Sequence, residues 1–234
     1  EMFGSVLDRT LLKTNASPED FRKLCEGAHE SGSYICVSPD AQKLVGNIIA
    51  SGGLDKVRGV AVVGWEFPNG NLDSTVKAEG HERIFKAGAS DVDIVINHHI
   101  SDWELFRQEI YITAITAEKC LETTGARTFK TIFEMAAFKS EDHKRRAIEV
   151  WLSVLKANAL KLNFMFKTGT GFWLDEKTRN AQRSDVRLAS KLIGRYNHET
   201  NNIGIKAAGG IKTARQALEF MLDAGVADKD GNLL

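Results

Sequence analysis

Two lysines, Lys167 and Lys206, each stand inside a short apolar run that leads into glycines. The runs read NFMFKTGTGF (163–172) and IGIKAAGGI (203–211). Burial of an ammonium among apolar side chains is costly and lowers its pKa, and a second cation nearby lowers it further. A neutral lysine attacks carbonyls, so the pattern predicts Schiff-base chemistry on a substrate whose phosphate approaches glycine amides. The alternative is that one or both lysines reach the surface from strand ends.

A carboxylate, Asp93, lies in a third apolar run, DVDIVIN (91–97). Alternation along a strand places Asp93, Val95 and Asn97 on the face opposite to the intervening valine and isoleucines. Beside a pair of lysines, Asp93 is suited to relay protons. The alternative is an acid exposed at the rim of the sheet.

Two further groups in the chain contain side chains able to take part in chemistry. Lys130 and Glu134 share one face of a predicted strand, where they either form an interior ion pair or lie at the strand ends. His98 and His99 follow another strand, but adjacent strand residues point to opposite faces and no acidic or histidine partner stands at ligand spacing. We therefore expect no metal site.

The composition is compatible with this chemistry and favours a small-molecule partner. The 234 residues are 43% hydrophobic, and 31 Lys and Arg balance 31 Asp and Glu, which disfavours nucleic acid and membrane partners. Cys25, Cys36 and Cys120 are odd in number and widely spaced, which argues against a disulfide framework or structural zinc. There is no apolar stretch of membrane-spanning length and no signal-peptide pattern, so we expect a cytoplasmic protein.

Short β-rich runs alternate with helical patterns, as in an α/β protein built from repeated βα units. Seven strands are predicted, at residues 6–12, 34–37, 57–64, 92–97, 128–134, 164–168 and 203–207. Helices are expected at 73–86, 102–123, 178–196 and 213–224, and helix-start residues stand at Ser17, Ser38, Ser140 and Thr213. No linker divides the chain. We predict one domain, residues 1–234, forming a (β/α)8 TIM-type barrel whose eighth strand and helix are missing or atypical. Asp93, Lys167 and Lys206 would lie toward the C-terminal ends of its strands.

Six segments, in order, resemble motifs of the deoxyribose-phosphate aldolase family, over nearly the whole chain. They are Asp8-Arg9-Thr10-Leu11-Leu12, Ile35-Cys36-Val37, Phe67-Pro68-Asn69-Gly70, Gly88-Ala89-Ser90-Asp91-Val92-Asp93, Lys167-Thr168-Gly169-Thr170-Gly171 and Lys206-Ala207-Ala208-Gly209-Gly210-Ile211.

The resemblance implies a lyase, a class I aldolase acting on aldehydes and a sugar phosphate without metal or organic cofactor. Lys167 would form the Schiff base, Lys206 would be the neighbouring cation, and Asp93 would assist proton transfer. Asp8, Thr10, Lys130, Thr168, Thr170 and Cys36 would support this site, and amides around Gly171, Gly209 and Gly210 would hold the phosphate. Cys36 would be open to modification by aldehydes, or else an ordinary buried core thiol. We also expect a homo-oligomer, most simply a dimer, with the helical stretch 103–111 as one possible face.

Three departures from the family pattern bear on these expectations. Gly169 stands where a serine is usual, and two residues are inserted in the segment 64–68. The last strand of the family, with its phosphate-binding glycine and serine, has no counterpart, so the chain is either cut short or a variant. The remaining alternatives are a transaldolase or another phosphate-binding barrel enzyme, or a catalytically weak relative that acts as a binding protein.

Overall fold

The protein is described by a computed structural model that covers residues 4–99, 101–158, 160–175, 180–200 and 203–228. In this part of the chain seven β-strands alternate with seven α-helices. The strands are β1 (Asp8–Leu11), β2 (Tyr34–Val37), β3 (Val60–Val63), β4 (Asp91–Val95), β5 (Thr128–Ile132), β6 (Asn163–Lys167) and β7 (Ile203–Lys206). The helices are α1 (Pro18–Ser31), α2 (Pro39–Gly52), α3 (Ser74–Lys86), α4 (Trp103–Thr124), α5 (Glu141–Ala157), α6 (Arg183–Thr200) and α7 (Ala214–Ala224).

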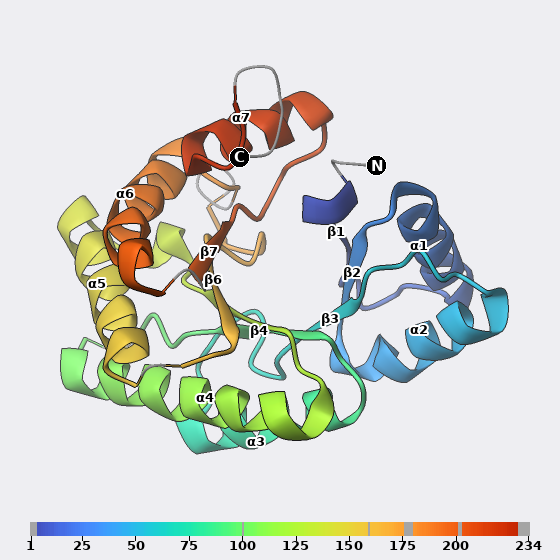
Figure 1. Cartoon of the computed structure of the whole chain (residues 1–234), viewed down its shortest axis with the longest axis horizontal. Helices are drawn as coiled ribbons and strands as arrows, with labels where there is room; N and C mark the ends of the chain where they lie inside the picture. Colours follow the sequence, from blue (N-terminus) through green and yellow to red (C-terminus); the bar gives the residue numbers. More distant parts are fainter. Residues whose placement is uncertain (1–3, 100, 159, 176–179, 201–202, 229–234) are drawn as a thin grey trace.

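The strands form one parallel sheet in chain order, from β1 at one edge to β7 at the other. Figure 1 shows that the sheet curls on itself and that the helices lie around its outside, from α1 and α2 on one side to α7 on the other. The predicted TIM-like α/β architecture is confirmed. Within the described residues the sheet has no eighth strand, so β1 and β7 are both edges.

Side-chain alternation divides the strands that carry the polar residues of the sheet, such as β4 and β6, between an outer apolar layer and an inner layer with charged side chains. On β6, Phe164 and Phe166 are buried in the large core between sheet and helices, whereas Lys167 belongs to the inner face. Full burial of such a phenylalanine contributes about 2–3 kcal/mol. A shift of β6 by one residue would turn the two phenylalanines to the inner face and move the lysine into the apolar core. The apolar pattern therefore determines the face on which Lys167 lies.

Strand β4 shows the same division, as its sequence predicts. Val92, Ile94 and the following Ile96 join the outer core, and Asp93 lies on the inner face, fully buried. The inner face also holds a small apolar cluster of Cys36, Ala61 and Val63, against which Leu12 and Phe67 pack.

Several predicted element boundaries differ from the structure by a few residues, and two of these differences concern the segments that follow β5 and β6. The helix expected from residue 178 begins at Arg183, because the amide of Ala181 donates to the carbonyl of Gly209 (3.0 Å) and not within a helix; residues 176–179 lie outside the described part. The fifth strand ends at Ile132 and not at Glu134, whose φ of 48° takes the backbone out of the extended conformation.

The predicted helix N-caps are confirmed at three of four positions. The hydroxyls of Ser17, Ser140 and Thr213 each accept a hydrogen bond from a backbone amide in the first turn of α1, α5 and α7, respectively. Ser38 occupies the same position before α2, but its side chain makes no capping hydrogen bond, and Pro39 starts that helix. None of the helices in the described residues is long and apolar enough to cross a membrane.

Candidate active site

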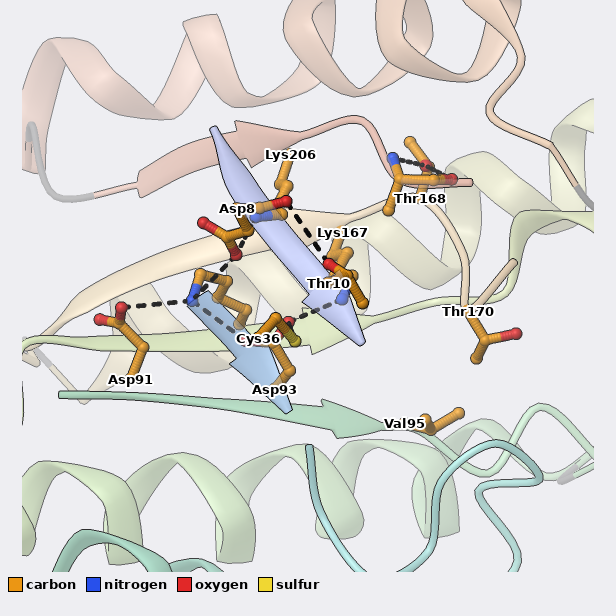
Figure 2. A network of polar contacts seen from close by, with 12 residues as sticks. Asp8, Thr10, Cys36, Asp91, Asp93, Val95, Lys167, Thr168, Thr170 and Lys206 are labelled. Carbon is orange, nitrogen blue, oxygen red and sulfur yellow. Dashed lines mark hydrogen bonds and ion pairs between the residues drawn. The ribbon is translucent and has the colours of Figure 1, made fainter. Parts of the chain in front are cut away.

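Strand register brings the predicted catalytic residues together on the inner face of the sheet. Lys167 and Lys206 are partners in the β6–β7 ladder, and Asp93 and Lys130 are partners in the β4–β5 ladder. Figure 2 shows Asp93, Lys167 and Lys206, with Asp8, pointing toward a common centre. Residues that are more than 190 positions apart in the chain thus form one network, as parallel β-barrels arrange at the C-terminal ends of their strands.

Lys167 is paired directly with Asp93 inside the barrel. Its Nζ lies 2.6 Å from Asp93 Oδ2, and Lys167 is only 6% exposed. Burial lowers the pKa of Lys167, but the charge and hydrogen bond of Asp93 raise it more, so its pKa lies above the ordinary value. The prediction that burial and a neighbouring cation would lower this pKa is therefore wrong for the unliganded site, where Lys167 is an ammonium.

Asp93 is the shared anion of the site. One carboxylate oxygen contacts Lys167, and the other accepts a hydrogen bond from Lys130 Nζ at 3.0 Å. Burial raises the pKa of Asp93, but Lys130 and Lys167 together bring it well below the usual value. Asp93 is thus a charged, fully buried carboxylate in contact with the amine that must lose a proton, which is the geometry that a proton relay requires.

Lys130 is held by three carboxylates and not by Glu134. Besides Asp93, its Nζ lies 3.5 Å from Asp91 Oδ2 and 3.9 Å from Asp8 Oδ2. Burial lowers the pKa of Lys130, and these anions raise it well above the ordinary value. The predicted ion pair between Lys130 and Glu134 does not form, because the strand ends between the two residues and Glu134 turns toward the next loop.

Asp8 connects the two edges of the sheet. Its Oδ2 forms an ion pair with Lys206 Nζ, so a side chain of β1 meets a side chain of β7. Burial raises the pKa of Asp8, while Lys206 and Lys130 lower it below the usual value. Thr10, two residues further on, is exposed, and its hydroxyl lies 3.5 Å from the Asp8 carbonyl oxygen.

Thr168 and Thr170 order the loop that follows the predicted nucleophile. The Thr168 hydroxyl accepts the amide of Ala208 (3.0 Å), which ties this loop to the one after β7. The Thr170 amide and hydroxyl both donate to the carboxylate of Glu134, and the Thr170 hydroxyl accepts the amide of Phe172 (3.0 Å). The segment after Lys167 is thus fixed from both sides.

Cys36 lies at the site and is also a core thiol. Its Sγ is 4.0 Å from Asp93 Oδ2, it is 1% exposed, and burial together with Asp93 raises its pKa to about 12. The thiolate is the reactive form, so Cys36 is chemically quiet in this arrangement.

The three glycines predicted to hold phosphate lie in two loops that touch each other. Gly171, Gly209 and Gly210 have φ values of 79°, 102° and 70°, which side chains other than glycine rarely adopt. A Cβ on Gly171 would lie 3.5 Å from the Cα of Gly209, so the loops after β6 and β7 approach as bare backbone. Such turns expose amides that bind anions.

Aromatic contacts across the loops were not foreseen from the sequence. Phe67, after β3, packs edge to face against Phe172, after β6, with ring centroids 5.3 Å apart. His98, after β4, meets Trp173 in the same way at 5.5 Å. The inserted Glu66 anchors the first of these loops by accepting the amide of Val95 (2.9 Å). Only the run of aromatic residues after the lysine motif hints at these contacts.

Asp91 and Glu134 are two further polar residues of the site. The sequence indicates no role for Asp91 and predicts Lys130 as the partner of Glu134. Asp91 stands two positions before Asp93, so strand alternation does place it on the same face. Across the described residues no three His, Cys, Asp or Glu side chains assemble in a way that would hold a metal ion.

Known proteins resemble this chain along nearly its full length. The chain is 35% identical over 223 residues to a deoxyribose-phosphate aldolase of Thermococcus kodakarensis, covering 94% of this chain and 88% of the relative. It is 33% identical over 226 residues to that of Mycoplasma pneumoniae, covering 96% and 88%. No family model matches the chain.

Solved structures show the same fold. The tetrameric deoxyribose phosphate aldolase of Aeropyrum pernix superposes with a TM-score of 0.71 at 22% identity, covering 94% of this chain and 82% of that one. An aldolase called QR15 gives 0.72 at 23% identity, covering 93% and 86%. The fold is thus that of the β/α-barrel aldolases. The identity to the curated relatives goes further: the chain belongs to the deoxyribose-phosphate aldolase family and is a lyase.

Proposed function

We propose that this protein cleaves 2-deoxyribose 5-phosphate to acetaldehyde and glyceraldehyde 3-phosphate, and catalyses the reverse addition, through a Schiff base on Lys167. The observation that carries the proposal is the contact of 2.6 Å between Lys167 Nζ and Asp93 Oδ2 inside the barrel. It places a charged carboxylate against the buried amine, which must lose a proton before it can form a Schiff base.

The reaction begins when the Lys167 ammonium loses its proton to water beside Asp93, because the lowered pKa of Asp93 keeps that carboxylate charged. The neutral amine adds to the aldehyde carbon of the open-chain sugar, and the carbinolamine loses water to give an iminium ion. The iminium draws electrons from the bond between C2 and C3, which breaks as the C3 hydroxyl loses its proton, so glyceraldehyde 3-phosphate leaves and an enamine remains. Protonation of the enamine carbon and addition of water release acetaldehyde and restore the amine. Asp93 is placed to return protons in these steps.

Lys206 and Lys130 make the deprotonation of Lys167 feasible. Both are cations on the inner face, and both disfavour a third positive charge beside them. Asp8 partly neutralises Lys206, and Asp93 is shared with Lys130. The resting site is therefore balanced, with Lys167 protonated but close to groups that stabilise its neutral form. The iminium electron sink is formed by the amine itself, so the proposed route uses no metal or organic cofactor.

The phosphate is assigned to the two glycine loops. Amides around Gly171, Gly209 and Gly210 lie just beyond the ends of β6 and β7, next to the two lysines, and their positive φ values turn the backbone into a concave surface.

Trapping of the Schiff base tests the proposal. With acetaldehyde and cyanoborohydride, the wild-type protein should gain a stable ethyl group on Lys167, located by peptide mass spectrometry, and Lys167→Met should lose both the adduct and turnover. Lys86→Met is the control, because Lys86 also pairs with a carboxylate, Glu82 (2.6 Å), but on the exposed surface of α3. An adduct mainly on Lys206 or Lys130 would contradict the assignment.

We further propose that residues 1–234 act as a single domain in the cytoplasm and associate as a homodimer. The free, buried state of Cys25, Cys36 and Cys120 supports a reducing compartment. Leu105 and Tyr111 on α4 are about half exposed, which supports the predicted contact face. Sedimentation analysis of the wild type and of Leu105→Glu tests the dimer: the substitution should shift the protein toward monomer.

A further inference from the structure

Asp91 is a buried carboxylate that the proposed reaction does not use. It is 2% exposed, lies at the start of β4, and faces the same side as Asp93. Its Oδ2 is 3.5 Å from Lys130 Nζ and 3.3 Å from the hydroxyl of Ser90. Burial raises the pKa of Asp91 above the usual value, and the contact with Lys130 opposes that rise.

Asp91 completes a balanced set of charges. The inner face carries three cations and three anions linked by the contacts already described: Lys130, Lys167 and Lys206 with Asp8, Asp91 and Asp93. In Figure 2, Asp91 lies to one side of this set, away from Lys206, and a dashed line marks the ion pair of Asp91 with Lys130. The set is neutral when Lys167 is protonated, which favours the ammonium.

Lys130 connects Asp91 to the reacting amine. Lys130 divides its contacts between Asp91 (3.5 Å) and Asp93 (3.0 Å), and Asp93 divides its two oxygens between Lys130 and Lys167. If Asp91 carried no charge, the ammonium of Lys130 would interact more strongly with Asp93. Asp93 would then have less negative charge available for Lys167.

We propose that Asp91 is a positioning residue that acts through Lys130 to set the pH range in which Lys167 becomes a nucleophile. This inference rests on the proposed function, since it concerns the same lysine. It predicts that one step, the deprotonation of Lys167, becomes easier when Asp91 is replaced by a neutral residue. The reason is that the set of charges is then balanced when Lys167 is neutral.

Every other titratable or charged group that faces Lys167 is kept in the first arm of the experiment. They come from β1, β2, β4, β5, the turn after β5, and β7, and are Asp8, Cys36, Asp93, Lys130, Glu134 and Lys206. The residues that β3 contributes to the inner cluster, Ala61 and Val63, do not titrate.

The test follows the rate of cyanoborohydride trapping of acetaldehyde on Lys167 as a function of pH, read from the Lys167 peptide by mass spectrometry. In Asp91→Asn the midpoint of this profile should move to lower pH by about 0.5 to 1 unit, since a nearby charge shifts a pKa by about that amount or more. Asp223→Asn is the control: the Asp223 side chain is also mostly buried and paired with cations, Arg183 and Arg187, and its loss should leave the midpoint in place.

A second arm tests the route through Lys130. In a Lys130→Met background, Asp91→Asn should shift the midpoint by less than it does in the wild type, because coupling between contacting residues is lost with either partner. Should Asp91→Asn fail to fold, which thermal melting would show, Asp91→Ser removes the same charge with a smaller side chain.

The outcomes separate this inference from the proposed function. A trapped adduct on Lys167 with an unchanged or higher midpoint in the Asp91 variants would overturn the inference and leave the function standing. An equal shift with and without Lys130 would overturn the route through that lysine. Absence of any adduct on Lys167 in the wild type would overturn the proposed function, and the inference with it.

Discussion

Lys206 on β7 and Asp8 on β1 form an ion pair between two strands that share no backbone hydrogen bonds. Asp8 is almost fully buried, and Lys206 is 17% exposed at its side chain. The contact therefore joins the two edges of the sheet through side chains alone, and it places a cation of the site beside the strand that carries Lys167. The ion pair serves both the fold and the chemistry.

Replacing Lys206 by methionine should change both the stability of the fold and the pH dependence of the reaction. Loss of a neighbouring cation, together with the uncompensated charge of Asp8, raises the pKa of Lys167, so the pH optimum of turnover should move to higher pH. Breaking a buried pair should also lower the free energy of unfolding by about 3 kcal/mol, as measured by urea denaturation. Lys206→Arg keeps the charge and should keep the optimum. If turnover falls with no change in the pH profile, Lys206 binds phosphate and does not tune Lys167.

Replacing Asp93 by asparagine should separate adduct formation from turnover. Without this anion the pKa of Lys167 falls, so trapping with acetaldehyde should extend to lower pH than in the wild type. Steady-state cleavage should drop about 100-fold or more, because the later proton transfers lose their relay. Asp223→Asn, which removes an aspartate paired with two arginines outside the barrel, is the control and should change neither. Normal turnover in the Asp93 variant would remove it from the mechanism.

Phe172→Ala should weaken substrate binding more than catalysis. The edge-to-face contact between Phe67 and Phe172 joins the loops after β3 and β6, and such a contact is worth about 0.5–1.5 kcal/mol. We expect KM for the sugar phosphate to rise roughly 2- to 12-fold, the equivalent of that energy, with a smaller change in kcat. Leu174→Ala lies in the same loop, 94% exposed, and should leave both constants unchanged. An equal effect of the two substitutions would show that the loop, and not the ring contact, matters.

Gly171→Ala tests the phosphate assignment. At a φ of 79° an alanine is strained, and relief of that strain would turn the amides of this loop away from a bound anion. The preference for glyceraldehyde 3-phosphate over glyceraldehyde as acceptor should fall about tenfold, close to the loss of one hydrogen bond to a charged group. Gly125→Ala, at a φ of 74° after α4, introduces the same strain away from the site. A retained preference in Gly171→Ala would place the phosphate elsewhere.

The sequence by itself determined the order of the elements and the residues to suspect. Alternation in β4 and β6 assigned Asp93 and Lys167 to the face opposite the buried aromatic and branched residues, because a one-residue shift would reverse the whole apolar pattern. Helix caps at Ser17, Ser140 and Thr213 were equally local, since each depends on three or four neighbouring residues. The glycines after both lysines indicated positions where side chains do not fit.

Only the tertiary structure decided how the charges are paired. Lys130 pairs with Asp91 and Asp93 and not with Glu134. The register of β5 with β4 brings the two aspartates within 3.5 Å of the Lys130 ammonium, whereas β5 ends before Glu134, which lies in the next loop. The same register gave Lys167 a carboxylate partner, which reversed the expected direction of its pKa shift. A pKa depends on distances of a few ångströms between groups far apart in the chain, and such distances exist only once the strands have met.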